Sequence, residues 1–223
     1  MSVIHISELF ISIQGEGIDA GAPSFFIRTS GCSIGCKYCD TKYSWSRGRE
    51  WKIDDLIEEV LKSEIPEVVI TGGEPVEEKN LPVLIRKLSC IDSIRKITLE
   101  TCGHIFRDDL GAPKLKIVLS PKPPTMEVEF PERALQKFLT TYEDTYIKFA
   151  VYDKNDLEVI RQFTYRNAKL IRKPIVIQPL EVPFENYVET SKRVSELVIA
   201  DREFINDFKI KIIPQLHKLI GLK

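Results

Sequence analysis

The sequence predicts an α/β protein with a mainly parallel sheet, arranged either as a partial barrel or as an open doubly wound sheet. Strand-like and helix-like segments alternate about six times along the 223 residues, which is typical of parallel strands joined by right-handed helical crossovers. Six units are too few for a complete eight-stranded barrel. Hydrophobic residues make up 43% and charged residues 29% of the chain, so we expect one globular domain over residues 1–223.

The expected strands are short segments rich in β-branched and aromatic residues. The segment EVVIT shows this composition most clearly. In this prediction the chain enters its first strand only at residue 24, and the strands are residues 24–29, 67–71, 96–101, 114–120, 145–151 and 174–180.

The expected helices carry apolar residues on one face. In residues 52–65 the apolar positions recur at three- and four-residue spacing, at Ile53, Leu56, Ile57, Val60 and Leu61. A proline near the start of residues 78–90 costs little there, because the first helical N–H groups have no partner. Further helices are expected at 131–142, 154–165 and 182–200, and a last segment, 208–221, starts as a strand or a helix and is interrupted by Pro214.

Composition argues against several classes of function. The formal net charge is −1, so a strongly basic surface for nucleic acid is not indicated. Apolar runs such as VVI and IKIIP are far too short to span a bilayer. The first residues, MSVIHISELF, lack the basic and apolar regions of a signal peptide. We therefore expect a cytoplasmic protein with no nucleic-acid or membrane partner.

Unusual short motifs follow the ends of five expected strands. The carboxyl ends of parallel strands meet at one edge of a sheet, where α/β proteins bind their ligands. We therefore expect one site that brings all five motifs together. In chain order they are the cysteine loop after residue 29, GGEP after 71, CG after 101, SPKPP from 120, and QPLE from 178.

Three of the five cysteines lie in CSIGCKYCDT, residues 32–41, with the spacing C-x3-C-x2-C. A closed zinc site takes four ligands, usually as two close pairs, so zinc would need a distant ligand such as Cys102 or His104. Thiolates are also the ligands of iron–sulfur clusters. Three of them leave one iron of a 4Fe–4S cluster free to bind a small molecule. The spacing favours such a cluster on Cys32, Cys36 and Cys39, with zinc as the alternative.

This spacing, followed by GGEP, resembles the radical S-adenosylmethionine superfamily. The resemblance implies a partial (β/α)6-type barrel and a 4Fe–4S cluster whose open iron chelates S-adenosylmethionine. It implies reductive cleavage of that molecule to a 5′-deoxyadenosyl radical, with electrons from a reductant such as flavodoxin or ferredoxin. The cofactors carry the difficult chemistry, while the protein binds and shields them. Tyr38 would lie near the adenine, or pack over the cluster.

Further motifs are similar to the 7-carboxy-7-deazaguanine synthase family over most of the chain: SIQGEG, FIR, CDT, TGGEP, ETCG, SPK, QP and QLHK. This resemblance implies ring contraction of 6-carboxy-5,6,7,8-tetrahydropterin to 7-carboxy-7-deazaguanine with loss of ammonia, on the route to queuosine or archaeosine. The radical would take the hydrogen at C6, Mg2+ would assist the rearrangement, and the hydrogen would return to regenerate S-adenosylmethionine. The resemblance also implies a homodimer.

The residues around QGEG suit a pterin, which presents donors, acceptors and a carboxylate. Gln14 can both donate and accept, Glu16 can accept from an amino group, and Gly15 allows close backbone approach. QGEG is also consistent with a mere tight turn between two strands. Arg28 would pair with the substrate carboxylate if it points inward, whereas strand alternation also permits a solvent-facing arginine. Together with the resemblance to the family, these residues give the set expected to contact the substrate: Ile13, Gln14, Gly15, Glu16, Arg28, Thr71 and His217.

A second set of residues is expected to contact S-adenosylmethionine. Backbone carbonyls at Gly72 and Gly73 can accept from its amino group, and Glu74 would hold either this turn or that amino group. Most of the set follows from the resemblance alone: Tyr38, Cys39, Asp40, Gly72, Gly73, Glu74, Ser120, Pro121, Lys122, Gln178, Pro179 and Leu180.

Three other residues raise separate questions. Thr41 offers the hard oxygen ligand that Mg2+ prefers, or it caps a helix or turn; the resemblance favours the metal. Cys102 stands where the family commonly has an amide, and because a thiol cannot replace an amide as a two-way hydrogen bonder, we expect it to pack. Cys90 is expected in the core. No residue is assigned a catalytic proton transfer.

Two other functions fit parts of the sequence. An activase that places a glycyl radical on a partner protein would share the cysteine spacing, but it would not need QGEG and Arg28. A non-enzymatic iron–sulfur or zinc protein that binds RNA would fit the cysteines alone. The near-neutral charge and the motifs at strand ends argue against that last reading.

Overall fold

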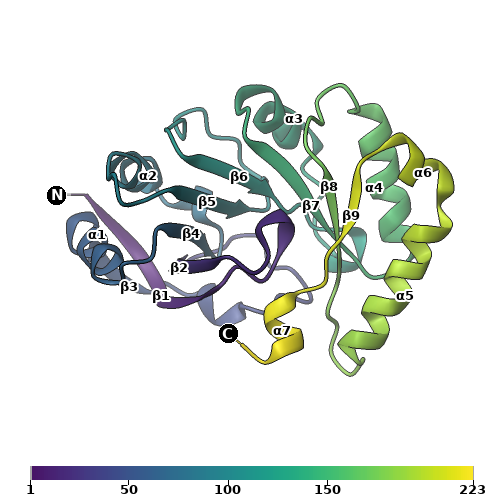
Figure 1. The fold of residues 1–223 in the computed structure, drawn as a ribbon, viewed down its shortest axis with the longest axis horizontal. Helices are drawn as coiled ribbons and strands as arrows, with labels where there is room; N and C mark the ends of the chain where they lie inside the picture. Colours follow the sequence, from purple (N-terminus) through teal and green to yellow (C-terminus); the bar gives the residue numbers. More distant parts are fainter. Residues whose placement is uncertain (1, 223) are drawn as a thin grey trace.

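Within residues 2–222, which the computed structural model describes, nine strands form one sheet (Figure 1). Their order across the sheet is β3-β1-β2-β4-β5-β6-β7-β8-β9. Their bounds are β1 Val3–Ile13, β2 Pro23–Thr29, β3 Arg49–Lys52, β4 Glu67–Gly72, β5 Lys96–Thr101, β6 Leu115–Leu119, β7 Thr145–Val151, β8 Ile175–Pro179 and β9 Ile210–Ile212.

The sheet is mainly parallel and does not close. From β2 to β9 every neighbouring pair is parallel, whereas β1 pairs antiparallel with both β2 and β3. Strands β3 and β9 remain as edges. This is the partial barrel that the sequence predicts, and the six expected strands correspond to β2, β4, β5, β6, β7 and β8. Because these strands run the same way, their carboxyl ends share one edge of the sheet.

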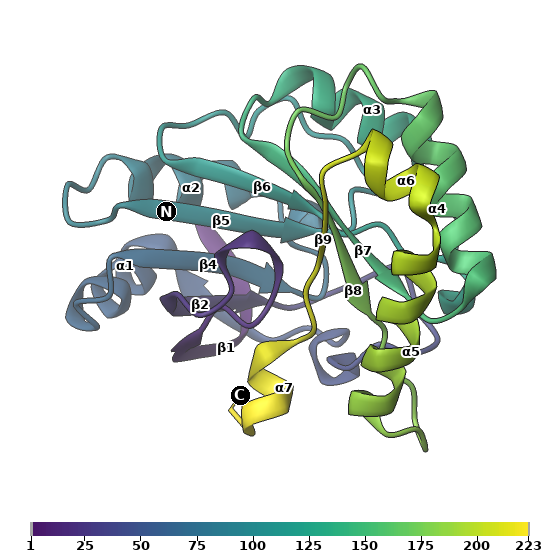
Figure 2. The ribbon, with the colours of Figure 1, turned by 45° about the vertical axis from the view of Figure 1, so that its right-hand side comes forward.

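Helices surround the outside of the sheet, except for the last one, which lies near the loop that joins β1 and β2 (Figures 1 and 2). One apolar core joins the sheet to these helices, with fully buried Ile70, Leu99 and Phe138 among its members. No helix of residues 2–222 has the length and apolar character needed to cross a membrane. The helices are α1 Ile53–Lys62, α2 Leu81–Ser89, α3 Glu132–Thr141, α4 Lys154–Arg166, α5 Tyr187–Ala200, α6 Arg202–Asp207 and α7 Leu216–Ile220.

Capping explains where the structure departs from the expected helix ends. The side chain of Asn186 accepts hydrogen bonds from the N–H groups of Val188 and Glu189, so α5 begins at Tyr187 and not at residue 182. The segment 208–221 divides at Pro214 into the short strand β9 and the short helix α7. Helix α6 was not predicted, since it has only one buried residue, Phe204.

The prediction that the first strand begins at residue 24 is wrong. Strand β1 precedes it and pairs with β2 over most of its length. Its first half buries Ile4 and Ile6, at 0% and 2% exposure, but the register shifts between Ile6 and Glu8. Such an irregularity interrupts the period-two pattern that identifies a strand in sequence. QGEG therefore lies in a connection between two strands.

Cys90 is also placed wrongly by the sequence prediction, because its side chain is exposed. It stands directly after α2 as the C-terminal cap. The buried face of that helix ends one residue before Cys90, with Leu88 and Ser89. Helical spacing identifies the buried face, but it does not show at which residue burial stops.

Candidate active site

A cavity of about 370 Å³ opens at the carboxyl ends of the parallel strands, within the size range of small-molecule sites. The final residues of neighbouring strands line it, including Thr71, Thr101 and Gln178. Every residue expected in the substrate, cofactor and metal sets also lines it, with the exception of Pro121, which is buried outside the lining. The five motifs thus meet in one place.

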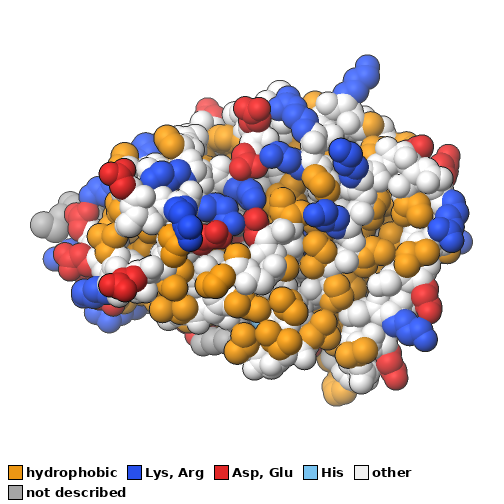
Figure 3. Space-filling model, in the orientation of Figure 1, with side chains coloured by type: hydrophobic (Ala, Val, Ile, Leu, Met, Phe, Trp, Pro, Cys, Tyr) orange, Lys and Arg blue, Asp and Glu red, His pale blue; other side chains and the backbone are white. Residues whose placement is uncertain are grey.

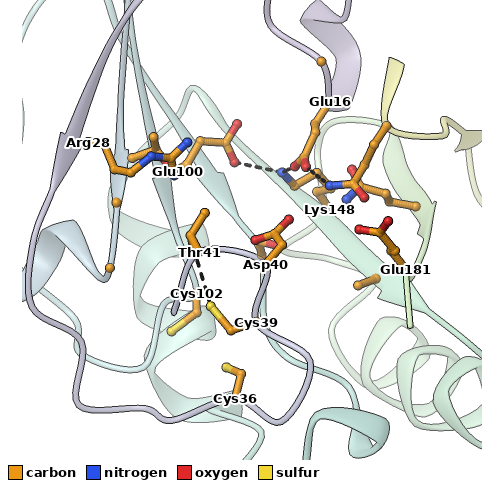
Figure 4. Close-up of a pocket in the computed structure, with 18 of the residues that line it drawn as sticks. Glu16, Arg28, Cys36, Cys39, Asp40, Thr41, Glu100, Cys102, Lys148 and Glu181 are labelled. Carbon is orange, nitrogen blue, oxygen red and sulfur yellow. Dashed lines mark hydrogen bonds and ion pairs between the residues drawn. The ribbon is translucent and has the colours of Figure 1, made fainter. Parts of the chain in front are cut away.

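The cysteine loop forms one end of this cavity (Figure 4). Burial raises the pKa of the Cys36 thiol, and the neighbouring Cys39 and Cys32 raise it further, while Lys122 acts in the opposite direction. All three cysteines line the cavity, so their thiols are gathered at one end of it. Apolar side chains pack around them, among them Tyr38, Met126 and Leu180. Converging thiols in dry surroundings fit an iron–sulfur cluster.

The GGEP backbone lies directly against the cysteine loop. The N–H of Glu74 donates to the carbonyl of Gly31 at 2.9 Å, and the N–H of Gly73 donates to Thr29 at 3.1 Å. A Cβ atom at Gly73 would lie 2.0 Å from the carbonyl oxygen of Gly31, and one at Gly72 would lie 2.3 Å from the hydroxyl of Thr29. Only glycine allows this approach.

Glu74 has the contacts of a residue that holds this turn. Its buried carboxylate accepts hydrogen bonds from the N–H of Val76 at 3.2 Å and of Cys102 at 2.9 Å. It also accepts from the hydroxyl of Thr101. The turn after β4 is thereby joined to the end of β5. Cys102 is buried, as expected for a packing residue, but it lines the cavity as well.

A buried ionic network forms another part of the cavity (Figure 4). The ammonium of Lys148, in β7, donates to Glu16 and, at 3.0 Å, to Glu100 of β5. Burial opposes ionisation of Glu16, but Lys148 and Gln215 overcome it and lower its pKa to about 2. Burial raises the pKa of Glu100, and the charge of Glu16 adds to this rise. The network therefore holds Lys148 charged, Glu16 ionised and Glu100 readier to accept a proton.

The loop after β1 and the C-terminal segment hold each other in place. The side chain of Gln14 donates to Glu100 at 3.1 Å and accepts from the N–H of Glu16 at 3.1 Å. The N–H of Leu216 donates to the carbonyl of Gly15 at 2.8 Å. A Cβ at Gly15 would lie 1.8 Å from Nδ1 of His217. QGEG is thus both a connection between two strands and a wall of the cavity.

Arg28 faces the cavity and not the solvent. Its guanidinium lies 5.5 Å from the ring centre of Phe10 and 5.9 Å from that of Tyr43. Glu8 lies 3.4 Å from its Nε. That Nε atom is buried and makes no hydrogen bond within the described residues. A cation held by ring faces keeps donors available for a planar anion such as a carboxylate.

The two residues after the cluster cysteines do not act as side-chain caps. Thr41 precedes the short 3-10 helix Lys42–Ser44, yet its side chain makes no capping hydrogen bond. Its hydroxyl lies 3.5 Å from Sγ of Cys39 and lines the cavity. The carboxylate of Asp40 accepts from Lys218 of α7 at 3.2 Å. Thr41 therefore presents its hydroxyl to the cavity beside Cys39, and Asp40 joins the cysteine loop to α7.

A buried acceptor lines the cavity at the end of β8. The side-chain oxygen of Gln178 has no partner among the described residues, and the residue is 7% exposed. An unsatisfied buried acceptor costs free energy. A ligand that donates there, as the amino group of an adenine does, would remove this cost. Gln178 therefore offers an acceptor to a ligand in the cavity.

Sequence reasoning missed several residues of the cavity. Lys148 had one signal, a lone charged residue in the otherwise apolar and wholly buried strand TYIKFAV. Glu100 is the first residue of ETCG, but no role was assigned to it. Other lining residues without an assigned role include Phe10, Tyr43, Trp45, Met126, Glu181, Gln215 and Lys218, which long-range packing brings to the cavity.

The fold and the cysteine site together define a radical S-adenosylmethionine protein. The family model described as the radical SAM superfamily matches residues 26–117. The chain also resembles the crystal structure of Streptococcus suis SuiB bound to S-adenosylmethionine, with a TM-score of 0.57 over 82% of this chain and 45% of that one. The two are 15% identical, so this likeness shows the fold alone.

Relatives that cover most of the chain narrow this class. The 7-carboxy-7-deazaguanine synthase of Thermoplasma acidophilum is 31% identical over 96% of both chains. That of Rhodopirellula baltica is 38% identical over 72% of this chain and 69% of its own. The crystal structure of QueE from Escherichia coli gives a TM-score of 0.71 at 25% identity, covering 94% of this chain and 93% of that one. The chain belongs to the 7-carboxy-7-deazaguanine synthase family.

Replacement of Lys148 tests the ionic network. Lys148→Met leaves the carboxylates of Glu16 and Glu100, which are 21% and 12% exposed, without their cation. The free energy of unfolding at pH 7 should fall, by at most about 3–5 kcal/mol, the cost of breaking a fully buried pair. Without the lysine, burial raises the pKa of both carboxyls, and the folded variant gains protons as the pH falls. In the parent, the ionised Glu16 stabilises the folded state fully above its ordinary pKa of 4.5, and this contribution is lost only as the pH falls toward its folded pKa of about 2. The deficit should therefore be smaller at pH 5 than at pH 7.

Urea titrations followed by circular dichroism at both pH values measure this difference. Lys62→Met serves as the control, since the Lys62 side chain is 65% exposed, and it should leave the free energy of unfolding nearly unchanged. An equal deficit for Lys148→Met at both pH values would contradict the account of the network.

Proposed function

We propose that this chain is a 7-carboxy-7-deazaguanine synthase, which converts 6-carboxy-5,6,7,8-tetrahydropterin to 7-carboxy-7-deazaguanine with loss of ammonia. The proposal depends on one observation, a single cavity that combines three converging thiols with a buried Glu–Lys–Glu network. Its family membership and the names of its relatives support the same reaction. The product would serve as a precursor of queuosine or archaeosine.

Cys32, Cys36 and Cys39 would hold a 4Fe–4S cluster with its open iron toward the cavity. Together with S-adenosylmethionine, such a cluster supplies the radical that removes hydrogen from the substrate. The chain contributes a dry environment, because Met126 and Leu180 pack beside the thiols and exclude water. Water exclusion protects a reactive site from side reactions.

The cavity offers each part of S-adenosylmethionine a matching group. Carbonyls near Gly72 and Gly73 would accept from its amino group, and Lys122 would pair with its carboxylate. The hydroxyl of Ser120 would bond a ribose hydroxyl. The unpartnered oxygen of Gln178 would accept from the adenine amino group. These assignments are supported by the positions of the four groups in the cavity wall.

The remaining polar groups suit a carboxylated pterin. Its pyrimidine edge presents N–H donors beside a carbonyl acceptor. Ionised Glu16 would accept from the donors, Lys148 would donate to the carbonyl, and Glu100 would complete the set. Arg28 would bind the carboxylate. A ligand that lacks one of these groups leaves a polar group of the site unpaired, which is how a polar site rejects the wrong ligand.

Thr41 would bind Mg2+ together with substrate oxygens. Mg2+ takes hard oxygen ligands and keeps several waters. The Thr41 hydroxyl lines the cavity next to Cys39 and is not used as a cap. A metal at this point would lie between the cysteine loop and the substrate.

The electron donor, the location and the oligomeric state are proposed mainly from the membership of the family. We propose a flavodoxin or ferredoxin as electron donor and a reducing, cytoplasmic location, which suits five free cysteines. A homodimer is supported by apolar side chains exposed at the C-terminal end, Leu219, Ile220 and Leu222, since exposed apolar patches mark contact surfaces. Figure 3 shows hydrophobic side chains over this part of the molecule.

Product formation tests the proposed reaction. Cluster-loaded protein, kept anaerobic and mixed with the carboxylated tetrahydropterin, S-adenosylmethionine, Mg2+ and dithionite, should release deazaguanine product and ammonia in equal amounts. Cys36→Ala should lose the brown cluster and the activity. Cys90→Ser should keep both, because Cys90 is exposed and does not line the cavity. Absence of product from protein that holds its cluster and binds S-adenosylmethionine would overturn the proposal.

The response to magnesium tests the role of Thr41. Thr41→Ala should need at least about tenfold more Mg2+ for half-maximal rate, since loss of groups that support a metal typically weakens binding by 10–100-fold. Thr140→Ala is the control, because Thr140 is an exposed residue of α3. If the Thr41→Ala variant responded to Mg2+ as the parent does, the hydroxyl would not be a ligand.

A further inference from the structure

Three side chains with metal-binding atoms, none of them from the cysteine loop, meet beside the cavity, and two of them line it. Sγ of Cys102 lies 3.4 Å from Nδ1 of His104. That same nitrogen lies 3.9 Å from Oε2 of Glu74. All three ligand atoms lie within 4.8 Å of one another. The residues come from the turns that follow β4 and β5, and the proposed reaction uses none of them as a metal ligand.

Two members of the cluster are almost fully buried. Glu74 and Cys102 are 2% and 6% exposed, and Oε2 of Glu74 is offered only one N–H, that of Cys102. Nε2 of His104 lies 2.9 Å from a carboxylate oxygen of Glu77, but this buried nitrogen has no hydrogen-bond partner among the described residues. A metal ion would give the sulfur, Nδ1 and Oε2 a common partner.

The spacing of the three atoms fits zinc. Zinc takes Cys, His and carboxylate ligands tetrahedrally, at about 2.3 Å for sulfur and about 2.0–2.2 Å for nitrogen and oxygen. Those bond lengths separate neighbouring ligand atoms by roughly 3.3–3.6 Å. The observed 3.4 Å and 3.9 Å separations need only small shifts. Glu77 beside the outer nitrogen of His104 has the place of a carboxylate that orients a metal-binding histidine.

Charge balance also favours an ion here. A divalent cation with one thiolate, one carboxylate and a neutral imidazole has no net charge. Lys122 acts electrostatically on Cys102, and a neutral site next to its ammonium creates no repulsion. Binding would release one proton, that of the Cys102 thiol.

We propose that Glu74, Cys102 and His104 form a second metal site, independent of the iron–sulfur cluster, that binds Zn2+. Cys102 and Glu74 both line the cavity, so the fourth position is open to water or a bound ligand. Catalytic zinc sites keep such an open position, whereas structural ones are closed. The inference stands on these three residues and does not require the proposed reaction.

Metal analysis of cluster-loaded protein tests this site. With about four irons per chain in place to occupy the loop cysteines, the protein is incubated anaerobically with Zn2+ and passed through a desalting column with a weak chelator. The parent should retain one zinc per chain, and X-ray absorption at the zinc edge should show one sulfur neighbour at about 2.3 Å. Cys102→Ser and His104→Ala should weaken zinc binding more than 100-fold, and Glu77→Gln by about 10–100-fold.

Matched variants make the result specific. Cys90→Ser and His5→Ala remove the same side-chain types elsewhere and should bind zinc like the parent. Iron content reports whether each variant is folded. If Cys102→Ser does not fold or does not hold its cluster, the zinc binding of His104→Ala decides the test, because His104 does not line the cavity. No retained zinc in the parent, two or more sulfur neighbours, or unchanged binding by His104→Ala would overturn the proposal. Zinc binding and deazaguanine formation are separate readouts, so either can fail alone.

Discussion

The pocket depends on the ion pairs that the ammonium of Lys148 makes with two carboxylates. The lysine is 3% exposed and stands between the carboxylates of Glu16 and Glu100. Without it those two negative charges would lie together with little access to solvent, which is unfavourable. Through Glu16 it fixes the loop after β1 and, by way of Gln215, the C-terminal segment. One buried cation thus joins both ends of the chain to the centre of the sheet.

The cavity has two chemically different parts. Around the cysteines the wall is apolar, with Met126, Leu180 and Tyr38 packed together. Around Lys148 it is charged and already hydrogen-bonded before a ligand arrives. The apolar part suits a cluster and a reactive intermediate, and the charged part suits a pterin edge. Parallel strands bring the two together, because their carboxyl ends share one edge.

Local signals in the sequence were sufficient for much of this arrangement. The parallel strands have β-branched composition, and the cysteine, GGEP and QGEG motifs each occupy a short stretch. Residues that act through long-range contacts were not predictable in this way. Lys148 carries no motif. Glu100 and Gln215 stand in ETCG and QLHK, but their roles appear only when β5, β7 and the C-terminal segment meet. Strand β1 was missed because its register shift breaks the alternation. Cys90 was misplaced because periodicity does not show where burial ends.

Several ion pairs and hydrogen bonds hold parts of the site together. Glu77 accepts from the N–H and hydroxyl of Ser33 in the cysteine loop. Lys218 connects Asp40 with Glu181 at the end of β8. These contacts tie the loop to the strand ends on both sides. A cluster site needs such support because its ligands come from a loop and not from a regular element.

An anaerobic crystal structure with cluster, S-adenosylmethionine and the carboxylated tetrahydropterin would test the central claim most directly. The account predicts a pterin whose pyrimidine edge contacts Glu16, Glu100 and Lys148 while its carboxylate pairs with Arg28. A pterin bound with its carboxylate toward Glu16 and Glu100, or bound outside this cavity, would contradict it.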